Sequence, residues 1–268
     1  MLPISIIIPA YRDPRLEQCL NSIDEQVEVV VVLNGATREV EEIAEKHKDV
    51  VIGRLSEPGL PQAYNHGIEL ASHPNVLIMD SDCVFLPGTI RKLYEKLEEV
   101  PLAKGRVLFN FKSSVHKIVA RVRHIHTAGK KAYSPPLAFR KSILSDIEGY
   151  FFHSDLSWTE DFDFDARVKK ANLPISYDDS ARIVHPELTI REDLRSSFHY
   201  GQGHAEGVHL NIQWYKPVLP YSWKQKKQMF QLIKKKYGTW TAIYMMFWQR
   251  AFYKGYQNKS KQFQNQTN

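Results

Sequence analysis

The 268-residue chain has little cysteine, and its last quarter has no acidic residue. Its two cysteines, Cys19 and Cys83, are too few for a disulfide framework or a four-ligand structural zinc site. The longest apolar run, around residues 240–248, is far shorter than the ~20 residues that a membrane-spanning helix needs. The N-terminal apolar segment lacks a basic start and is interrupted by Pro3 and Pro9, unlike a signal peptide. We therefore expect a cytoplasmic chain with reduced thiols.

The missing acidic residues divide the chain into two parts of opposite charge. Residues 207–268 hold eleven Lys and Arg, no Asp or Glu, and four of the five Trp. The other 25 basic residues share residues 1–206 with all 30 acidic ones. The net charge of +6 is thus an average over an acidic region of −5 and a basic, aromatic region of +11. This basic region needs an anionic partner or an acidic surface.

Strand and helix patterns alternate along the first hundred residues. Apolar runs typical of strands buried on both faces are separated by segments with helical periodicity. This alternation predicts an α/β fold with a largely parallel sheet and helices on both sides. Ligands bind beyond the carboxyl ends of the strands in such sheets, so the loops that follow them should converge. The predicted strands are 4–8, 27–33, 50–55 and 76–79, and the loops are 9–13, 34–37, 57–62 and 80–82.

The remainder of the chain is less regular. We expect strands over 102–109 and 175–177 and a helix over 162–171, followed by helices after Pro186. The predicted domains are an α/β domain over 1–188 and a helical, basic, aromatic-rich extension over 189–268.

Three groups of side chains could carry chemistry. Asp80 and Asp82 leave a buried strand one residue apart, where two carboxylates can meet a divalent cation that prefers oxygen ligands. Glu160 and Asp161 precede a helix, where a carboxylate could accept a proton from an attacking hydroxyl. The simpler interpretation of this segment is a solvated acidic first turn at the positive end of the helix dipole, and it accounts well for Asp163 and Asp165. The third candidate is His185, which follows a predicted strand.

The order of these motifs resembles family 2 glycosyltransferases of the GT-A fold. The resemblance runs from about residue 4 to residue 186 and implies a nucleotide-binding, Rossmann-like mixed sheet flanked by helices. Its matching segments are Ile6-Ile7-Ile8-Pro9-Ala10-Tyr11, Leu16 to Gln26, Val29 to Val32 with Asn34-Gly35-Ala36-Thr37, Gly59 with Ala63-Tyr64-Asn65-His66-Gly67-Ile68, the DXD motif Met79-Asp80-Ser81-Asp82 and the ED motif Glu160-Asp161-Phe162-Asp163.

The resemblance implies that 1–188 is a catalytic domain, with nucleotide-sugar and metal binding in 1–100 and the acceptor side and catalytic base in 101–188. It also implies a role for each matching residue. Asp161, with Glu160 beside it, would be the catalytic base of an inverting transfer to an acceptor hydroxyl. Asp82 would be the firmer ligand of Mn²⁺ or Mg²⁺, with Asp80 and His185 completing the metal site. The nucleoside-diphosphate sugar would be held by Pro9, Ala10, Tyr11, Asn34, Asn65, Asp80 and Ser81. Two positions depart from the family pattern: Leu33 replaces an acidic residue near the base, and Tyr64 replaces an arginine near the donor.

The basic extension favours a location at an anionic surface. Its lysines interleave with Trp and other apolar residues, as in helices that lie on membranes. Packing against the acidic region and nucleic-acid binding are the alternatives, the second being the least favoured. We expect no nucleic-acid partner, and a peripheral position on the inner face of the membrane would suit a lipid-linked acceptor.

Three classes of function follow from the residues and the resemblance. The first is a metal-dependent, hexosyltransferase-type enzyme acting on a saccharide or lipid-linked acceptor in glycan, glycolipid or cell-envelope polysaccharide synthesis. A nucleotidyltransferase also suits two acids at a strand end, but it has no need of Glu160-Asp161 with His185. A non-catalytic nucleotide-sugar or membrane-binding protein could lose Asp80, Asp82 and Asp161, which are all present.

Overall fold

The computed structural model describes residues 1–267, with side chains described for residues 1–265, as two compact units. The first unit comprises residues 1–108, 127–154 and 160–186, and the second comprises 109–126, 155–159 and the described residues from 187 onward. Residues after 186 therefore fall in the second unit, close to the predicted boundary at 188, together with two shorter segments from the middle of the chain. The division into a catalytic and an extension domain stays a prediction about function.

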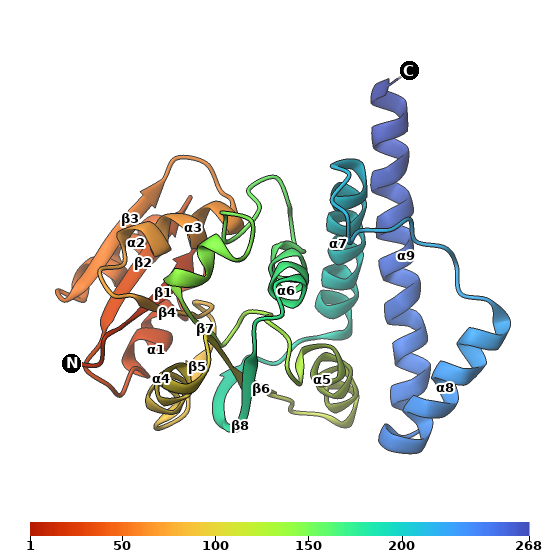
Figure 1. The fold of residues 1–268 in the computed structure, drawn as a ribbon. Helices are drawn as coiled ribbons and strands as arrows, with labels where there is room; N and C mark the ends of the chain where they lie inside the picture. The colour runs from red at the N-terminus through yellow and green to blue at the C-terminus, as the bar shows by residue number, and fades with distance from the viewer. Residues whose placement is uncertain (268) are drawn as a thin grey trace. The chain divides into compact units, whose positions relative to one another are not determined.

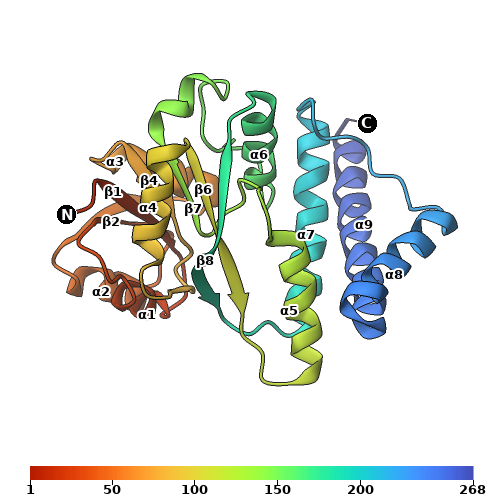
Figure 2. The ribbon, with the colours of Figure 1, turned by 60° about the horizontal axis from the view of Figure 1, so that its bottom comes forward.

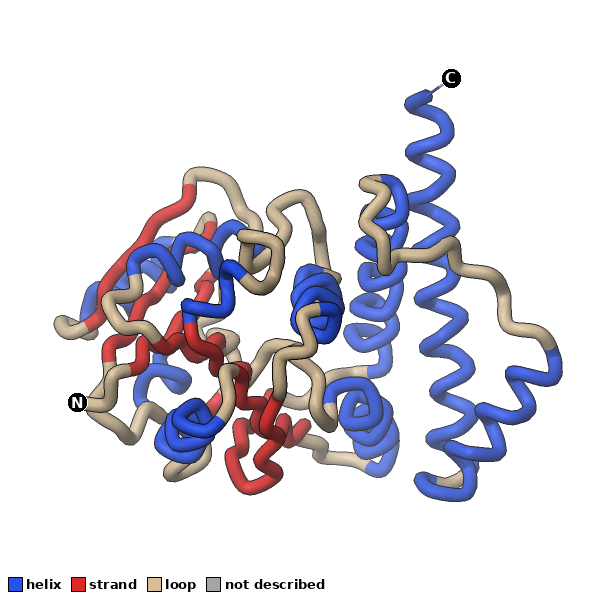
Figure 3. Tube along the Cα trace, in the orientation of Figure 1, coloured by secondary structure: helices blue, strands red, loops and turns tan. Residues whose placement is uncertain are grey.

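An eight-stranded mixed sheet, whose strands are drawn red in Figure 3, forms the framework of the first unit. The strand order is β3-β2-β1-β4-β7-β6-β8-β5. The four strands β3, β2, β1 and β4 are parallel to one another. The next strand, β7, is antiparallel to both of its neighbours, β4 and β6. The bounds are β1 Ile4–Ala10, β2 Glu28–Asn34, β3 Val50–Leu55, β4 Asn75–Ile78, β5 Val84–Phe85, β6 Leu102–Phe109, β7 Leu137–Arg140 and β8 Ile175–His185.

Helices cover both faces of this sheet (Figure 2). Right-handed crossovers from β1 to β2 and from β2 to β3 place α1 and α2 on one face, and the return from β3 to β4 places α3 on the other. The bounds are α1 Leu16–Asn21, α2 Arg38–Lys46, α3 Leu60–Leu70, α4 Thr89–Glu99, the short 3₁₀ helix Lys141–Ser145 and α6 Glu160–Lys170.

Alternating side chains of the central strands build the core. Every residue of β1 is buried, and Ile7 pairs in register with Val30 on one side and Ile78 on the other. Ile7 belongs to a cluster that includes Ala63 of α3 and Phe164 of α6. Because Gly67 of α3 has no Cβ, its backbone can approach Ile7 where a Cβ would lie 2.3 Å from the methyl Cγ2. This close packing fixes the strand ends relative to α3 and α6.

The second unit is helical (Figure 1). It contains most of α5 Ser114–Thr127, then α7 Ile190–His209, α8 Trp223–Tyr237 and α9 Thr239–Thr267. Capping boxes begin two of them: Thr189 with Glu192 starts α7, and Ser222 with Gln225 starts α8. None of the described helices is long and apolar enough to cross a membrane.

Close backbone contact joins α7 to α9, which lie side by side in both ribbon views (Figures 1 and 2). A Cβ on Gly201 would lie 1.9 Å from the carbonyl oxygen of Phe252, and one on Gly255 would lie 1.8 Å from that of Phe198. Both glycines therefore permit a helix separation that any larger residue would prevent. The Ser197 hydroxyl also donates a hydrogen bond of 2.6 Å to the carbonyl of Trp248.

Candidate active site

The loops after the parallel strands converge at one edge of the sheet, as predicted. The Thr37 amide donates to the carbonyl oxygen of Tyr11 at 3.1 Å, which joins the loops after β1 and β2. The Gly59 amide donates to Asn34 Oδ1 at 2.7 Å, which joins the loops after β2 and β3. The parallel register forces this convergence, because all four strands end at the same edge.

Asp80 lies at the centre of this edge, directly after β4. The Tyr64 hydroxyl of α3 donates to Asp80 Oδ1 at 3.0 Å. Burial, and then the charge of Asp82, raises the pKa of Asp80 to about 7. At the position where the family pattern has an arginine, this chain therefore supplies a neutral hydrogen-bond donor. Because the pKa of Asp80 lies near neutral pH, small changes in its surroundings decide whether its carboxyl group is charged.

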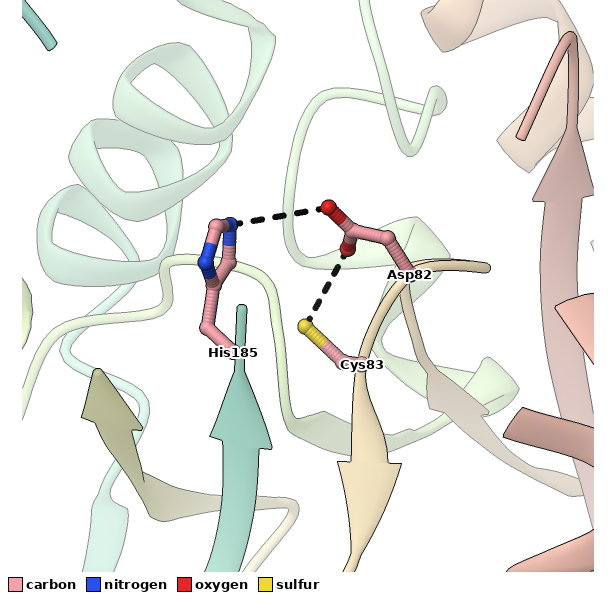
Figure 4. A group of neighbouring side chains, drawn as sticks. All are labelled: Asp82, Cys83 and His185. Carbon is pink, nitrogen blue, oxygen red and sulfur yellow. Dashed lines mark hydrogen bonds and ion pairs between the residues drawn. The ribbon is translucent and has the colours of Figure 1, made fainter. Parts of the chain in front are cut away.

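Asp82, Cys83 and His185 form a compact cluster at the same edge (Figure 4). Asp82 Oδ2 lies 3.7 Å from His185 Nε2, and the side chains are 24% and 18% exposed. The Cys83 thiol donates to Asp82 Oδ1 at 3.4 Å. Burial raises the pKa of this thiol far above its usual range, so in the metal-free chain it stays protonated and its hydrogen bond orients Asp82.

The orientation of His185 suits it to bind a cation. Its Nδ1 lies 2.8 Å from the carbonyl oxygen of Pro186, which can only accept, so Nδ1 carries the proton. In the neutral imidazole, Nε2 then presents a lone pair toward the Asp82 carboxylate. Two lone-pair donors that face each other across 3.7 Å fit a bound divalent cation, and a carboxylate with one imidazole is a donor set that Mn²⁺ accepts.

The helix α6 begins at Glu160, two residues before the predicted start, and this places Glu160 and Asp161 in its first turn. Glu160 is 4% exposed, and its Oε2 has no hydrogen-bond partner among the described residues. Burial, and then the charge of Asp161, raises the pKa of Glu160 to about 8. Asp161 is half-buried, and burial raises its pKa to about 7. Near neutral pH Glu160 is thus mainly protonated, and Asp161 is the stronger candidate for a base.

The interpretation of Asp163 and Asp165 as solvated residues is wrong. Asp163 is fully buried, and its Oδ2 accepts a hydrogen bond of 2.9 Å from Nε of Arg167 and forms an ion pair with Nη2 of Arg167 at 2.9 Å. Asp165 is 3% exposed and accepts from the backbone amide of Ala132 at 2.8 Å. The helical i,i+4 spacing that places Arg167 over Asp163 is visible in the sequence, but the burial of that pair is not. These two acids hold α6 in place.

Two basic residues that the sequence did not single out lie among these acids. Lys104 of β6 is 1% exposed, donates to the carbonyl of Pro135, and has a pKa lowered to about 7 by burial. The charges of Asp161 and Asp80 oppose that lowering, which shows how near they lie. In the sequence, Lys104 follows Leu102 by two residues, so strand alternation places both side chains on the same, core-facing side; this is the only signal that points to Lys104.

The second of these basic residues is Arg15, at the start of α1. Its Nε donates to Asp13 Oδ1 at 2.8 Å, and its Nη2 lies 3.7 Å from Asp82 Oδ2. Arg15 is the residue that precedes α1, and it engages the Asp13 carboxylate. Arg15 thus adds a guanidinium beside the proposed metal ligands.

The remaining predicted donor-binding residues occupy varied positions. Pro9 and Ala10 are buried in β1, whereas Tyr11 is 40% exposed beside the guanidinium of Arg12. Asn65 has both ends of its amide engaged by the backbone of Phe152, at 2.7 and 3.0 Å. The Asn65 side chain therefore positions the loop around residue 152. Ser81 is half-buried between the two aspartates of the DXD motif.

Comparisons with known proteins agree with this geometry. The family model described as glycosyl transferase family 2 matches residues 5–159, which is more than half of the chain. A curated relative, the uncharacterized glycosyltransferase YwdF of Bacillus subtilis (strain 168), is 28% identical over 185 residues, covering 63% of this chain and 69% of that protein.

Solved structures share the fold. TarS 1–349 of S. aureus in complex with UDP-GlcNAc has a TM-score of 0.55 at 17% identity, covering 98% of this chain and 91% of that one. The mannosyltransferase PcManGT of Pyrobaculum calidifontis, in complex with GDP-Man and Mn²⁺, has a TM-score of 0.57 at 18% identity, covering 97% and 83%. The mixed sheet flanked by helices is thus the expected GT-A fold, and this chain belongs to glycosyl transferase family 2.

Proposed function

We propose that the chain transfers a hexosyl group from a nucleoside-diphosphate sugar to an acceptor hydroxyl with inversion of configuration. The observation that carries this proposal is that Asp161 and Asp80 lie near each other at the sheet edge where the strand loops converge. Besides burial, the charge of Asp161 raises the pKa of Asp80, and both charges oppose the burial that lowers the pKa of Lys104. One half-buried base beside a cation-binding cluster suits a single displacement. Membership of the family favours this function over nucleotidyl transfer and over binding without catalysis.

Asp161 is the proposed base. Its carboxylate takes the proton of the acceptor hydroxyl as the oxygen lone pair forms a bond to the anomeric carbon. The bond from that carbon to the diphosphate oxygen breaks, and the leaving diphosphate keeps the bonding pair. Attack opposite the leaving group inverts the anomeric centre. Glu160, with a pKa of about 8, remains protonated beside Asp161, so it adds no second negative charge near neutral pH.

Asp82 and His185 are the proposed ligands of Mn²⁺ or Mg²⁺, with Asp80 next to them. A divalent cation bound there would neutralise charge on the departing diphosphate. His185 is held by the carbonyl of Pro186, and Asp82 by the thiol of Cys83, so both present their lone pairs before any ligand arrives. Arg15 lies close enough to Asp82 to contact the diphosphate from the side of α1.

The donor is proposed to rest on the loops after β1 and β2. Tyr11 offers an exposed ring, and Asn34 joins two of the loops through Gly59. Pro9, Ala10 and Ser81 shape the backbone there, while Asn65 acts through the loop at Phe152. Relatives of this fold bind UDP-GlcNAc and GDP-Man, which supports a nucleotide sugar as the ligand. A saccharide or lipid-linked acceptor, in glycan or cell-envelope synthesis, is the proposed second substrate.

The membrane surface is the proposed location of the C-terminal extension. None of the residues of α8 is buried, and Trp223 is 81% exposed on a helix that carries six lysines. Exposed Trp beside lysine is the pattern of helices that lie on anionic lipid surfaces. This location would bring the active site to lipid-linked acceptors.

A thermal-shift panel of UDP, GDP and dTDP sugars, each with and without Mn²⁺, tests the donor site. We expect one donor to raise the melting temperature only when Mn²⁺ is present. Asp82→Asn and His185→Gln should remove that Mn²⁺ dependence, whereas Asp49→Asn, an exposed acid in the loop before β3, should retain it. An unchanged Mn²⁺ dependence in both site variants would show that the metal binds elsewhere. Failure of every donor to stabilise the chain would contradict the proposed function itself.

A further inference from the structure

The second unit contains a large, mostly apolar cavity that the proposed sugar transfer does not use. Its volume is about 1070 Å³, enough for a drug-sized ligand or a long hydrocarbon chain. The helices α8 and α9 meet at Gly238 and diverge from that turn (Figure 1). Residues of both helices and of the loop 218–221 line the cavity. We call it the α8–α9 groove; its lining includes Leu219, Trp223, Lys226, Lys227, Phe230 and Arg250.

One face of α8 contributes both apolar and basic side chains to the groove. Trp223, Lys226, Lys227 and Phe230 follow the i, i+3, i+4, i+7 spacing that places residues on the same side of a helix. The opposite wall carries Met246, Trp248 and Phe252 together with Arg250 of α9. Three cationic side chains therefore line a cavity whose other walls are mainly hydrocarbon and aromatic rings.

The charges define the kind of ligand that fits. No Asp or Glu occurs anywhere in residues 207–268, so the α8–α9 groove has no carboxylate from this segment to neutralise Lys226, Lys227 and Arg250. An apolar cavity alone would suit any hydrophobic molecule, and lysines alone would suit any polyanion. A ligand with a hydrocarbon chain and one anionic head group satisfies both parts, because the chain replaces water in the cavity and the head group meets the cations.

We propose that the α8–α9 groove binds one acyl chain of an anionic phospholipid of the membrane, with its phosphate at Lys226, Lys227 and Arg250. This goes beyond the contact of an exposed helix with a membrane surface. A surface contact would use every exposed lysine and apolar residue of α8 about equally, whereas the groove uses only those that line it. Binding needs no sugar donor or metal, so its failure would leave the proposed transferase function untouched.

Two matched pairs of variants separate the groove from general surface attraction. Leu219 and Leu232 are 78% and 71% exposed, but only Leu219 lines the groove. Lys226 and Lys227 line it, whereas Lys235 and Lys236 of the same helix do not. Leu219→Gln and Leu232→Gln each remove one leucine side chain. Lys226→Gln/Lys227→Gln and Lys235→Gln/Lys236→Gln each remove two positive charges. All of these side chains are exposed, so the variants should fold.

The measurement is quenching of tryptophan fluorescence by a brominated monoacyl phosphatidylglycerol, kept below its micelle concentration, because Trp223 and Trp248 line the groove. We expect saturable quenching with one lipid per chain. The affinity should fall about tenfold in Lys226→Gln/Lys227→Gln and about tenfold in Leu219→Gln. It should change less than about twofold in Lys235→Gln/Lys236→Gln and in Leu232→Gln.

Co-sedimentation with vesicles of phosphatidylcholine, with and without phosphatidylglycerol, gives the membrane arm of the test. The full chain should bind only the anionic vesicles, with the same ranking of variants. Equal losses in the groove and control variants would overturn the proposal in favour of a flat electrostatic contact. Equal binding of the brominated choline analogue would refute the role of the cations. Dimerisation that Leu219→Gln abolishes, or RNA binding in place of lipid binding, would identify a different occupant and overturn it too.

Discussion

Buried acids in the core of the second unit and at the sheet edge of the first unit have opposite surroundings. In the second unit, Asp193 and Ser197 are the fully buried polar residues of α7, and the carboxylate of Asp193 is matched by Arg123, which also contacts Tyr200, and by the Tyr244 hydroxyl at 2.6 Å. At the sheet edge of the first unit, Glu160 has an oxygen without a hydrogen-bond partner among the described residues, and Asp80 has its pKa raised to about 7. A satisfied buried charge supports folding, whereas an unsatisfied one is a cost that a bound ligand can relieve.

The helix α6 carries acids of both kinds, Asp161 and Asp163, two residues apart. We expect Asp161→Asn to lower the rate of sugar transfer by about 10³-fold, because the amide cannot accept the acceptor's proton. The melting temperature should stay the same or rise. Nucleoside diphosphate release from the donor identified by thermal shift measures the rate.

Asp163→Asn is the matched control, two residues along the same helix. It leaves Arg167 buried without its charge partner, so we expect about 3 kcal/mol less stability in urea unfolding. Donor binding by the folded fraction should be retained. A large loss of stability in Asp161→Asn, or a full transfer rate, would reverse the roles that we assign to these two acids.

Asp193→Asn tests the satisfied network of the second unit. Loss of the carboxylate leaves Arg123 and the Tyr244 hydroxyl facing a neutral amide, and we expect about 3 kcal/mol less unfolding free energy in urea. Asp179→Asn, which removes an exposed bridge to Arg106, should cost less than about 1 kcal/mol. Comparable losses in the two variants would mean that burial does not govern the strength of these pairs.

The acids with raised pKa values should make the metal-free chain less stable as the pH rises. Burial raises the folded-state pKa of Glu160 to about 8, and those of Asp80 and Asp161 to about 7. Between the unfolded values near 4 and these raised values, the folded state binds more protons, so stability declines as pH increases through that window. The melting temperature should therefore fall from pH 5 to pH 8.

Glu160→Gln should flatten that decline, because the amide does not ionise. The control is Glu57→Gln, an exposed acid in the loop after β3, which should leave the slope as it is. Scanning fluorimetry at several pH values, with chelator present, gives the curves. A wild-type melting temperature that rises over this range would contradict the raised pKa values.

Much of the fold was open to prediction from the sequence. The apolar runs of β1, β2 and β4 are long enough to mark strands buried on both faces, and the parallel register then determines where their loops meet. The DXD and ED residues stand out because their spacing follows the order of elements in a family, and their roles stay predictions. In the cluster of Asp82, Cys83 and His185, the sequence pointed to Asp82 and His185 but not to the thiol of Cys83 beside Asp82.

The failures share one physical cause. Asp163 and Asp165 were interpreted as solvated because acids in a first turn usually are. The neighbouring sequence does not indicate that their partners, Arg167 and the amide of Ala132, are buried with them. Lys104 was missed for the same reason, since a lysine in a strand normally reaches solvent. Burial of charge depends on contacts between distant segments, and those contacts are set by the tertiary fold rather than by neighbours in sequence.

The smallest effect that we predict concerns Lys104 of β6, a buried lysine close to Asp161 and Asp80. Its charge lowers the pKa of Asp161, and it lies in the region where Tyr64 has replaced the family's arginine. If Lys104 compensates for that arginine, Lys104→Met should move the rising limb of the pH–rate profile upward by about one pH unit. Lys104→Arg should restore the wild-type position. A lysine that serves packing alone would alter stability in both variants but leave the limb unmoved, because the pKa of the base responds to charge and not to shape.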